Sequence, residues 1–409
     1  MAPIIGAGTG LLLASPSAHP GGATPHVAVP IGIVVLAAVA VVVVVAVAVP
    51  PREHSPTGVR ADALTASWWG ELSRQQWVVR ALCLVVMLLA VVAGRIGADD
   101  ELENLAPALT VGAGLPLLVT GCLVLGRLWR WVDPWDTLVR LVAPGDPSRA
   151  PGHVWPAVAV VFPWLWYLGV YPRPLDPRAV GLALASYTVV TVAGCLAMGR
   201  VRWLSSSEPL GTLLSWVGLV PRLRLTRWTP PSGAAVLLGV VIGGLLFGAL
   251  RRTGLWSAVA VLPQATLYAT GGLLVACALG GTAAHLAARI GSPEQRAVAA
   301  RALVPAAAGV AIAVSVARNR LFTSVQLLPG LIGDPLGRGW DLLGTPTAGL
   351  DAAPLGAVGV VVLQLVVVAC AHLLAAATVP RPLVGDERLP VIVLLAGSVA
   401  AGVATLSLH

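Results

Sequence analysis

The sequence contains no lysine and few charged residues of any kind. Only 11% of its 409 residues are charged, against about 25% in an ordinary soluble domain, while 57% are hydrophobic and the mean hydropathy is +0.86. All 26 basic residues are arginine, and the five cysteines stand singly, without Cys-x-x-Cys spacing. This composition excludes a soluble globular domain, a disulfide scaffold and a zinc-finger-type cluster. It indicates an integral membrane protein.

Several catalytic and nucleotide-binding motifs are missing as well. The chain has no Walker-type loop, no His-x-x-x-His or Glu-x-x-His pattern and no Gly-x-Ser-x-Gly elbow. An ATP-driven pump, a zincin protease and an α/β-hydrolase are therefore not expected. The net charge of +8 comes from arginines in short connections between apolar runs, which membrane topology explains. No nucleic-acid partner is expected.

Ten apolar runs are predicted to cross a membrane. A helix rises 1.5 Å per residue, so about 20 residues cover the hydrocarbon core of about 30 Å. The first run, residues 27–49, consists almost entirely of Val, Ala and Ile. The others are predicted at 76–95, 107–126, 154–171, 178–199, 233–250, 264–288, 301–317, 355–378 and 389–407. We therefore expect an all-α fold, a polytopic transmembrane helix bundle of about ten helices with the lipid bilayer as its partner.

The distribution of arginine predicts the orientation of the bundle. If the first helix enters from outside, the connections on one side carry 17 arginines and those on the other side carry eight. The arginine-rich side should be cytoplasmic, so both termini are expected outside a bacterial cytoplasmic (inner) membrane. Residues 1–26 are predicted to be an extracytoplasmic segment with a signal-like apolar run, whose cleavage stays open. Residues 27–409 are predicted to form a single transmembrane domain with an outer polar loop at 318–354.

Two connections on the predicted cytoplasmic side, 127–144 and 200–221, resemble each other. Each has a cluster of Arg and Trp, then acid-Pro-x-x-Thr-Leu, then a short apolar run closed by Pro. Asp133 and Glu208, each followed by Pro, are the residue types that cap helix N-termini. Because the runs are too short to cross, each is predicted to be an interfacial or half-inserted helix on the cytoplasmic side. Arg80, near the start of the second run, is expected to extend its side chain to the cytoplasmic surface.

Glycines are regularly spaced in the run at 233–250. Gly239 and Gly243 are four residues apart, and so are Gly244 and Gly248. Two ridges of small residues at this spacing allow helices to pack at close range. The pattern predicts tight helix packing on two faces and says nothing about chemistry.

The most polar stretch between apolar runs is 333–345, GDPLGRGWDLLGT. It holds Asp334, Arg338 and Asp341 within eight positions, together with four glycines. Carboxylates, a guanidinium and backbone amides exposed at glycine can bind a divalent metal or an anion, or polarise a phosphoester. The alternative is a structural turn in which one of the two aspartates pairs with Arg338. Both interpretations stay open.

Two histidines lie inside predicted membrane helices. An ionisable residue is costly there, which makes it a functional hypothesis by default. For His285, near the cytoplasmic end of its run, we expect a hydrogen bond to a neighbouring helix. His372 lies deeper, on the same helix as Gln364, and is a candidate metal ligand beside Asp334 and Asp341. Whether His372 faces the bundle or the lipid distinguishes the two interpretations.

Four short motifs carry a resemblance to a known family. They are Asn104-Leu105-Ala106-Pro107, Trp131-x-Asp133-Pro134-Trp135, Trp203 to Glu208, and Asp334-Pro335-Leu336-Gly337-Arg338-Gly339-Trp340-Asp341. Over about residues 27–380 the chain resembles polytopic bacterial and archaeal membrane proteins labelled fenitrothion hydrolase-like. The resemblance implies a membrane-bound organophosphorus ester hydrolase with a metal-bound or base-activated water. It implies metal-ligand or base roles for Asp334 and Asp341, an oxyanion clamp at Arg338 and a further metal ligand at His372.

The chain also departs from the pattern of that family. It has Gly248 where the family tends to have Asp and Arg318 where the family tends to have His, and Thr378-Val379-Pro380-Arg381 stands where a second His is expected after His372. Two function classes follow. The first is a phosphotriester-type hydrolase with a divalent metal as cofactor, supported by the surviving motif at 334–341. The second, favoured by the missing acid and histidines, is a transporter or permease-like protein, or a non-catalytic subunit with a partner membrane protein.

Overall fold

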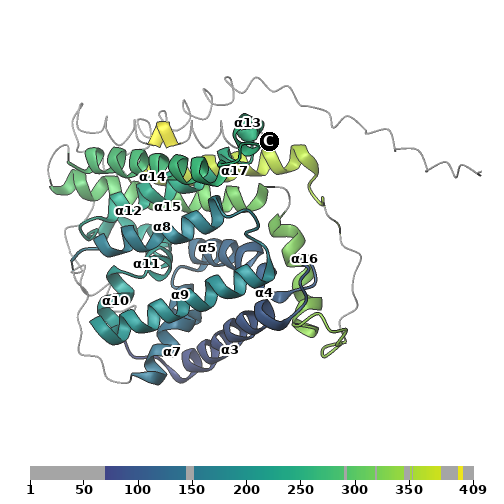
Figure 1. Ribbon diagram of the computed structural model, residues 1–409. Helices are drawn as coiled ribbons and strands as arrows, with labels where there is room; N and C mark the ends of the chain where they lie inside the picture. Colours follow the sequence, from purple (N-terminus) through teal and green to yellow (C-terminus); the bar gives the residue numbers. More distant parts are fainter. Residues whose placement is uncertain are drawn as a thin grey trace, which may run out of the picture.

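The computed structural model describes residues 70–143, 152–289, 293–317, 320–344, 351, 353–378 and 395–398. Within these ranges the chain is helical and has no strand, apart from an isolated bridge between His153 and Ser232, so the predicted all-α fold is confirmed (Figure 1). The first half contains α3 (Arg74–Ile96), α4 (Leu105–Pro107), η1 (Ala108–Gly112), α5 (Gly114–Leu125), α6 (Leu128–Val132), α7 (Pro134–Val142), α8 (Trp155–Gly169), α9 (Pro177–Met198), α10 (Arg200–Ser206), α11 (Pro209–Val217) and η2 (Pro221–Arg227). The second half contains α12 (Ala234–Leu250), η3 (Gly254–Trp256), α13 (Ser257–Ala260), α14 (Ala265–Arg289), α15 (Pro293–Val316), α16 (Arg320–Gly333) and α17 (Gly356–Ala377).

The eight membrane helices predicted between residues 76 and 378 each coincide with helical structure. Six are long and apolar enough to cross a membrane, and α12 with its bent continuation through α13 would make a seventh. Helix α8, at 15 residues, is shorter. The N-terminal segment 1–26, the first predicted helix and most of the last, 389–407, lie outside the described residues. The total of ten helices therefore stays a prediction.

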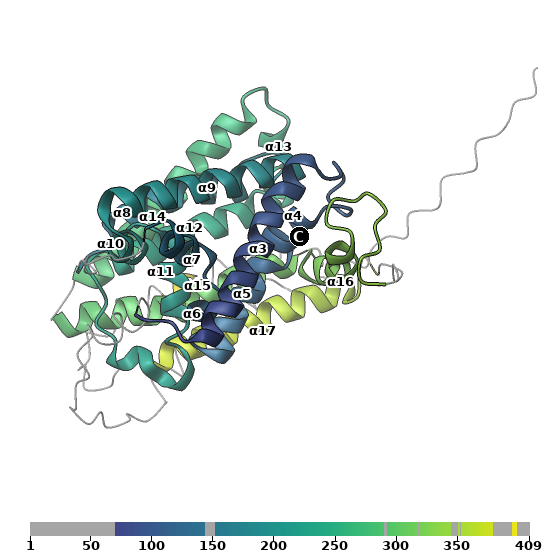
Figure 2. The ribbon, with the colours of Figure 1, turned by 90° about the horizontal axis from the view of Figure 1, so that it is seen from below.

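The long helices lie side by side, and short helices gather at the two ends of the bundle (Figures 1 and 2). Helix α12 packs against α8, α14 and α15, while α3 packs against α9. At one end, here called the α7 end, lie α6, α7, α10 and the start of α3. At the other, the α16 end, α16 runs across the ends of the long helices next to α4, inside the predicted outer polar loop. The positive-inside prediction assigns the α7 end to the cytoplasm.

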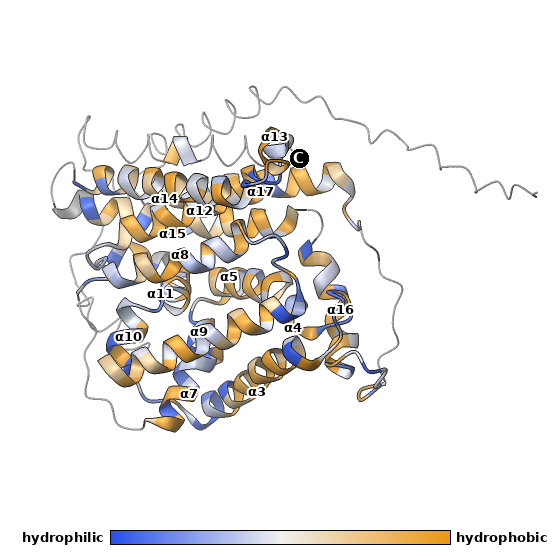
Figure 3. Ribbon diagram, viewed as in Figure 1, coloured by the Kyte–Doolittle hydropathy of each residue, from blue (hydrophilic) through white to orange (hydrophobic). Residues whose placement is uncertain are grey.

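The outer surface of the bundle is apolar along the long helices. Figure 3 shows hydrophobic residues on the outward faces of α3, α14 and α17. Exposed side chains there recur at helical spacing, for example Val78, Leu82 and Val85 on α3 and Val358, Val362 and Val366 on α17. In water such faces would be unfavourable, whereas lipid tails solvate them. Several helices of the chain thus have the surface of a multi-pass membrane protein.

The predicted glycine ridges on α12 face two neighbouring helices, α14 and α8. A Cβ at Gly239 would clash with the carbonyl of Gly280, and one at Gly243 with the carbonyl of Ala276, both on α14. Gly244 and Gly248 face α8 instead. A Cβ at Gly244 would lie 2.7 Å from Leu165. The two ridges therefore bring α12 close to α14 on one side and to α8 on the other, as their spacing predicts.

The helix predicted over 107–126 is broken into α4, the π-helical turn η1 and α5. Asn104 caps α4 by accepting from Ala106 N, and Ala113 N donates to Ala108 O at 2.7 Å across the π turn. At Gly112 a Cβ would clash with Ser324 of α16. A glycine here lets α16 lie directly on the turn.

Candidate functional site

The polar stretch predicted as a site forms a tight loop after α16. The carboxylate of Asp334 accepts hydrogen bonds from the backbone N–H groups of Arg338 and Gly339, at 2.9 and 2.6 Å. Gly337 and Gly339 have φ of +63° and +78°, a conformation that suits glycine. The carboxylate thus closes its own turn through backbone donors, and the predicted pairing of an aspartate with the Arg338 side chain stays a prediction.

Arg338 and Asp341 are exposed in the same loop. The guanidinium carbon of Arg338 lies 6.0 Å from the ring centroid of Trp340, a cation–π distance. Ala98 N donates to Leu336 O at 2.9 Å and joins the loop to the acidic connection between α3 and α4. The loop therefore keeps the three predicted catalytic residues together at the α16 end. Their catalytic role stays a prediction.

His372 faces the bundle and is fully buried on α17. Its Nδ1 lies 2.8 Å from Val368 O and its Nε2 lies 2.9 Å from Ser398 Oγ, so both ring nitrogens have protein partners. No group of three or more His, Cys, Asp or Glu side chains in the described ranges could hold a metal ion. Asp334, Asp341 and His372 accordingly do not form such a group.

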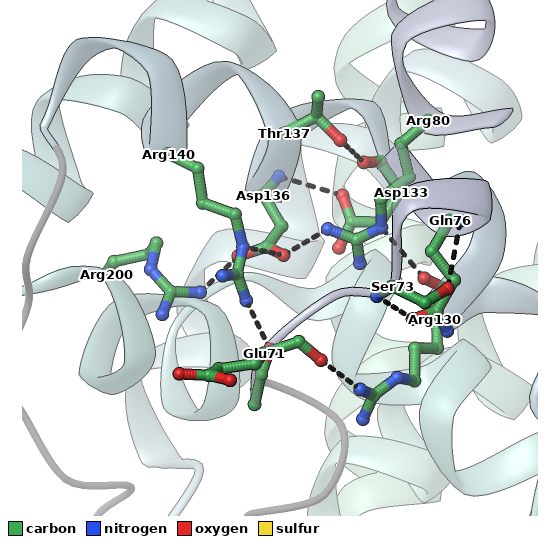
Figure 4. A network of polar contacts seen from close by, with 11 residues as sticks. Glu71, Ser73, Gln76, Arg80, Arg130, Asp133, Asp136, Thr137, Arg140 and Arg200 are labelled. Carbon is green, nitrogen blue, oxygen red and sulfur yellow. Dashed lines mark hydrogen bonds and ion pairs between the residues drawn. The ribbon is translucent and has the colours of Figure 1, made fainter. Parts of the chain in front are cut away.

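A buried polar cluster at the α7 end is centred on Asp136 of α7 (Figure 4). Its carboxylate forms ion pairs with Arg80 from α3, with Arg140 at 2.9 Å and with Arg200 from α10. Burial alone would raise the pKa of Asp136, but the charges of these arginines hold it below its ordinary value. Arg80 is fully buried and also donates from Nε to Arg130 O at 2.8 Å. The prediction that Arg80 extends to the surface was therefore wrong, because Arg80 pairs with the buried carboxylate of Asp136 inside the bundle.

The two acid-Pro pairs cap helices, as predicted. Asp133 accepts from Asp136 N at 3.0 Å at the start of α7, and Glu208 accepts from Leu210 N and Gly211 N at 2.9 and 2.7 Å at the start of α11. Both carboxyl groups are buried, with 1% and 2% exposure. Desolvation by burial raises the pKa of each to about 7, and for Asp133 the neighbouring charge of Asp136 adds to the effect.

The starts of α7 and α11 both lie beside the middle of α9. The Tyr187 hydroxyl donates to the Glu208 carboxyl group, while Trp135 Nε1 donates to Thr188 Oγ1 at 3.0 Å. The rings of Trp135 and Tyr187 are 5.1 Å apart. Since α9 ends at Met198, Thr188 lies about 15 Å from that end along the helix axis. Whether α7 and α11 are interfacial or half-inserted stays a prediction.

Two adjoining cavities lie in the centre of the bundle, with volumes of about 130 and 70 Å³. Trp135, Trp164 and Tyr187 line the first cavity on the side of α7 and α11. The second extends toward the α16 end, where Gly248, Arg252, Ser315 and Arg320 line it. Residues shared by both linings are Leu115, Val119, Leu165, Leu168, Leu245 and Ala311. Gly248, the position where the resembled family tends to have Asp, thus faces a cavity and not the polar loop.

The sequence did not reveal that Arg80 and Tyr187 join distant segments through buried contacts with Asp136 and Glu208. Arg80 and Tyr187 both lie inside predicted membrane helices, and an arginine in such a run is itself a signal for a buried partner. Tyr187 gives no comparable signal, because a tyrosine in an apolar helix is ordinary core. Its role depends on Glu208, 21 positions away.

The fold is that of a helical bundle with several helices long and apolar enough to cross a membrane and with cavities at its centre. Comparison of the chain with protein-family models, with curated proteins and with solved structures gives no match. Its function must follow from the chemistry of the cavity and of the residues around it.

Proposed function

We propose that the chain is a permease-like protein of a bacterial cytoplasmic membrane that takes an apolar solute into its central cavity. The observation that carries this proposal is the position of α7 and α11, whose first turns line that cavity with Trp135, Pro209 and Leu210. Transporters commonly place solute sites near the middle of the bilayer, next to discontinuous helices whose N-termini point inward. In this proposal the α7 end faces the cytoplasm and both termini face outside.

The lining of the first cavity selects the chemistry of the solute. It consists of aliphatic side chains from α5, α8, α9, α11, α12 and α15 with three aromatic rings. Apolar cavities of about 150 Å³ stay dry and bind molecules of the size of benzene, and this cavity has about 130 Å³. An uncharged, apolar group should therefore enter without displacing ordered water.

Binding of bromobenzene, a molecule close to benzene in size, to the purified protein tests the proposal. Trp135 and Trp164 line the cavity, so bound bromobenzene should give saturable quenching of tryptophan fluorescence. Ala308→Phe fills the cavity and should abolish the saturable component. Val275→Phe is the matched control, because this residue lies on α14 and is 59% exposed on its apolar outer face. Equal saturable quenching in the Ala308 variant and in the wild type would contradict the proposal.

A membrane hydrolase of phosphotriesters is the second candidate. The loop after α16 favours it, because Asp334 fixes a turn from which Arg338 and Asp341 project into solvent. Purified membranes should then hydrolyse aryl phosphotriesters with added divalent metal, and Asp341→Asn should lose this turnover while Asp100→Asn keeps it. Absence of metal-dependent turnover in folded wild type would exclude the candidate.

A further inference from the structure

The two central cavities adjoin each other and together outline an elongated space. They share lining residues from α5, α8, α12 and α15. One face of α15 follows the space along its length, with Val304 at the α7 side, Ala308 and Ala311 between, and Ser315 at the α16 side. Eleven residues separate Val304 from Ser315, which corresponds to about 16 Å along the helix axis. A space so long and so small in volume suits a flexible chain better than a rigid set of rings.

The two ends of this space differ in charge. Arg252 and Arg320 are among the residues lining the second cavity, and the adjacent Arg251 donates from its guanidinium to Gly169 O at 2.7 Å and to Val170 O. None of the residues that line either cavity in the described part of the chain is Asp or Glu. The opposite end, beside Tyr187, is lined by apolar and aromatic side chains. The space is thus apolar at one end and basic at the other.

We propose that this space binds an amphiphile with one anionic head, its head group at Arg252 and Arg320 and its apolar chain directed toward Tyr187. This inference rests on the proposed function and names its solute class. Guanidinium groups match carboxylate and phosphate oxygens in planar, charge-assisted hydrogen bonds. At the edge of a membrane interior such bonds are less screened than in water, which favours an anionic head over an uncharged one.

Three ligands with the same chain test the inference on the full-length protein: dodecanoate, dodecyl phosphate and dodecanol. The wild type should bind at least one of the two anions about tenfold or more tightly than dodecanol, in line with charge-assisted hydrogen bonds. A preference for dodecanoate identifies a carboxylate head, and a preference for dodecyl phosphate identifies a phosphate head. Added salt should weaken the binding of the two anions and leave the binding of dodecanol unchanged.

Variants separate the head group from the chain. Arg252→Gln and Arg320→Gln should lower the binding affinity of the two anions to that of dodecanol. Arg178→Gln should leave these affinities unchanged, because Arg178 is an exposed arginine near the start of α9 that pairs with Asp99. Ala308→Phe should weaken the binding of all three ligands. Equal affinity of the wild type for the anions and dodecanol, with loss of both in the Ala308 variant, would overturn the anionic head and leave the cavity proposal standing. No binding of any ligand, including bromobenzene, would overturn both.

Discussion

The hydroxyl of Tyr187, at the middle of α9, donates a hydrogen bond to the buried carboxyl group of Glu208. Tyr187→Phe removes this donor and leaves the carboxyl group with its two backbone partners. A buried polar group that loses a partner costs about 1–3 kcal/mol, so the free energy of unfolding should fall by about that amount. Unfolding in mixed detergent micelles measures it.

Tyr268→Phe is the control for that change. Tyr268 is 47% exposed, and its hydroxyl lies 3.5 Å from Gln264 Oε1, so little stability should depend on it. If both variants unfold alike, the hydrogen bond between α9 and the start of α11 does not stabilise the fold.

The ion pairs of Asp136 and Asp99 should differ in their effect on stability. Asp136→Asn leaves Arg80 buried without its carboxylate, and breaking a buried pair in this way costs about 3–5 kcal/mol. Asp99 pairs with Arg178 at 2.8 Å, but both side chains are more than 60% exposed. Asp99→Asn should therefore cost less than about 1 kcal/mol. Similar losses in the two variants, measured by the same micelle titration, would show that the buried cluster is solvated.

Stability should fall as pH rises from about 4.5 to about 7. Asp133 and Glu208 have pKa values of about 7 in the folded state and ordinary values of 3.8 and 4.5. In this window the folded protein keeps protons that the unfolded chain has released, so each pH step favours unfolding, and the slope ends above about pH 8. Asp136 has the opposite sign, but its lowered pKa places its effect below the window.

Thermal midpoints of the wild type and of the double variant Asp133→Asn, Glu208→Gln measure this pH dependence. The double variant lacks both groups and should give a flatter profile. A wild-type midpoint that climbs across the window would mean that both carboxylates are charged in the fold.

Glycines of the same chain should tolerate alanine very differently. At Gly239 a Cβ meets the backbone of Gly280, so alanine must push α12 away from α14, and overpacking of this kind costs about 1–3 kcal/mol. At Gly271 of α14 a Cβ meets nothing within 4 Å. Gly271→Ala should be neutral or stabilising by up to about 1 kcal/mol, because alanine favours helix. A Gly239 variant as stable as the Gly271 variant would show that the two helices can separate freely.

Local and periodic features could be predicted from the sequence. Long apolar runs fix membrane helices because the backbone must satisfy its own hydrogen bonds in lipid, and the acid-Pro pairs fix the starts of α7 and α11. The spacing of Gly239 and Gly243 likewise determines one face of a helix. Each of these depends on residues within a few turns of one another.

Contacts between distant segments could not be predicted in the same way. The position of Arg80 near a helix end suggests an arginine that reaches the surface. Its partner, Asp136, lies 56 positions later in the sequence and is brought beside it only by the fold. Asp334 looks like a ligand until its own loop supplies the donors that occupy it. The first cavity depends on side chains from seven helices, and none of these side chains is unusual alone. Such features depend on tertiary packing, which cannot be predicted from a single sequence by local patterns.

The position of α11 also constrains the order in which the protein is assembled. The helix packs on α8 and α5, which precede it, but also on α15, which begins 76 residues after α11 ends. At a synthesis rate of about 5–20 residues per second, its last neighbour emerges roughly 4–15 s later. Until then α11 lacks one of the helices that it packs on. The segment from Pro209 to Val217 therefore reaches its final position late, after most of the bundle has entered the membrane.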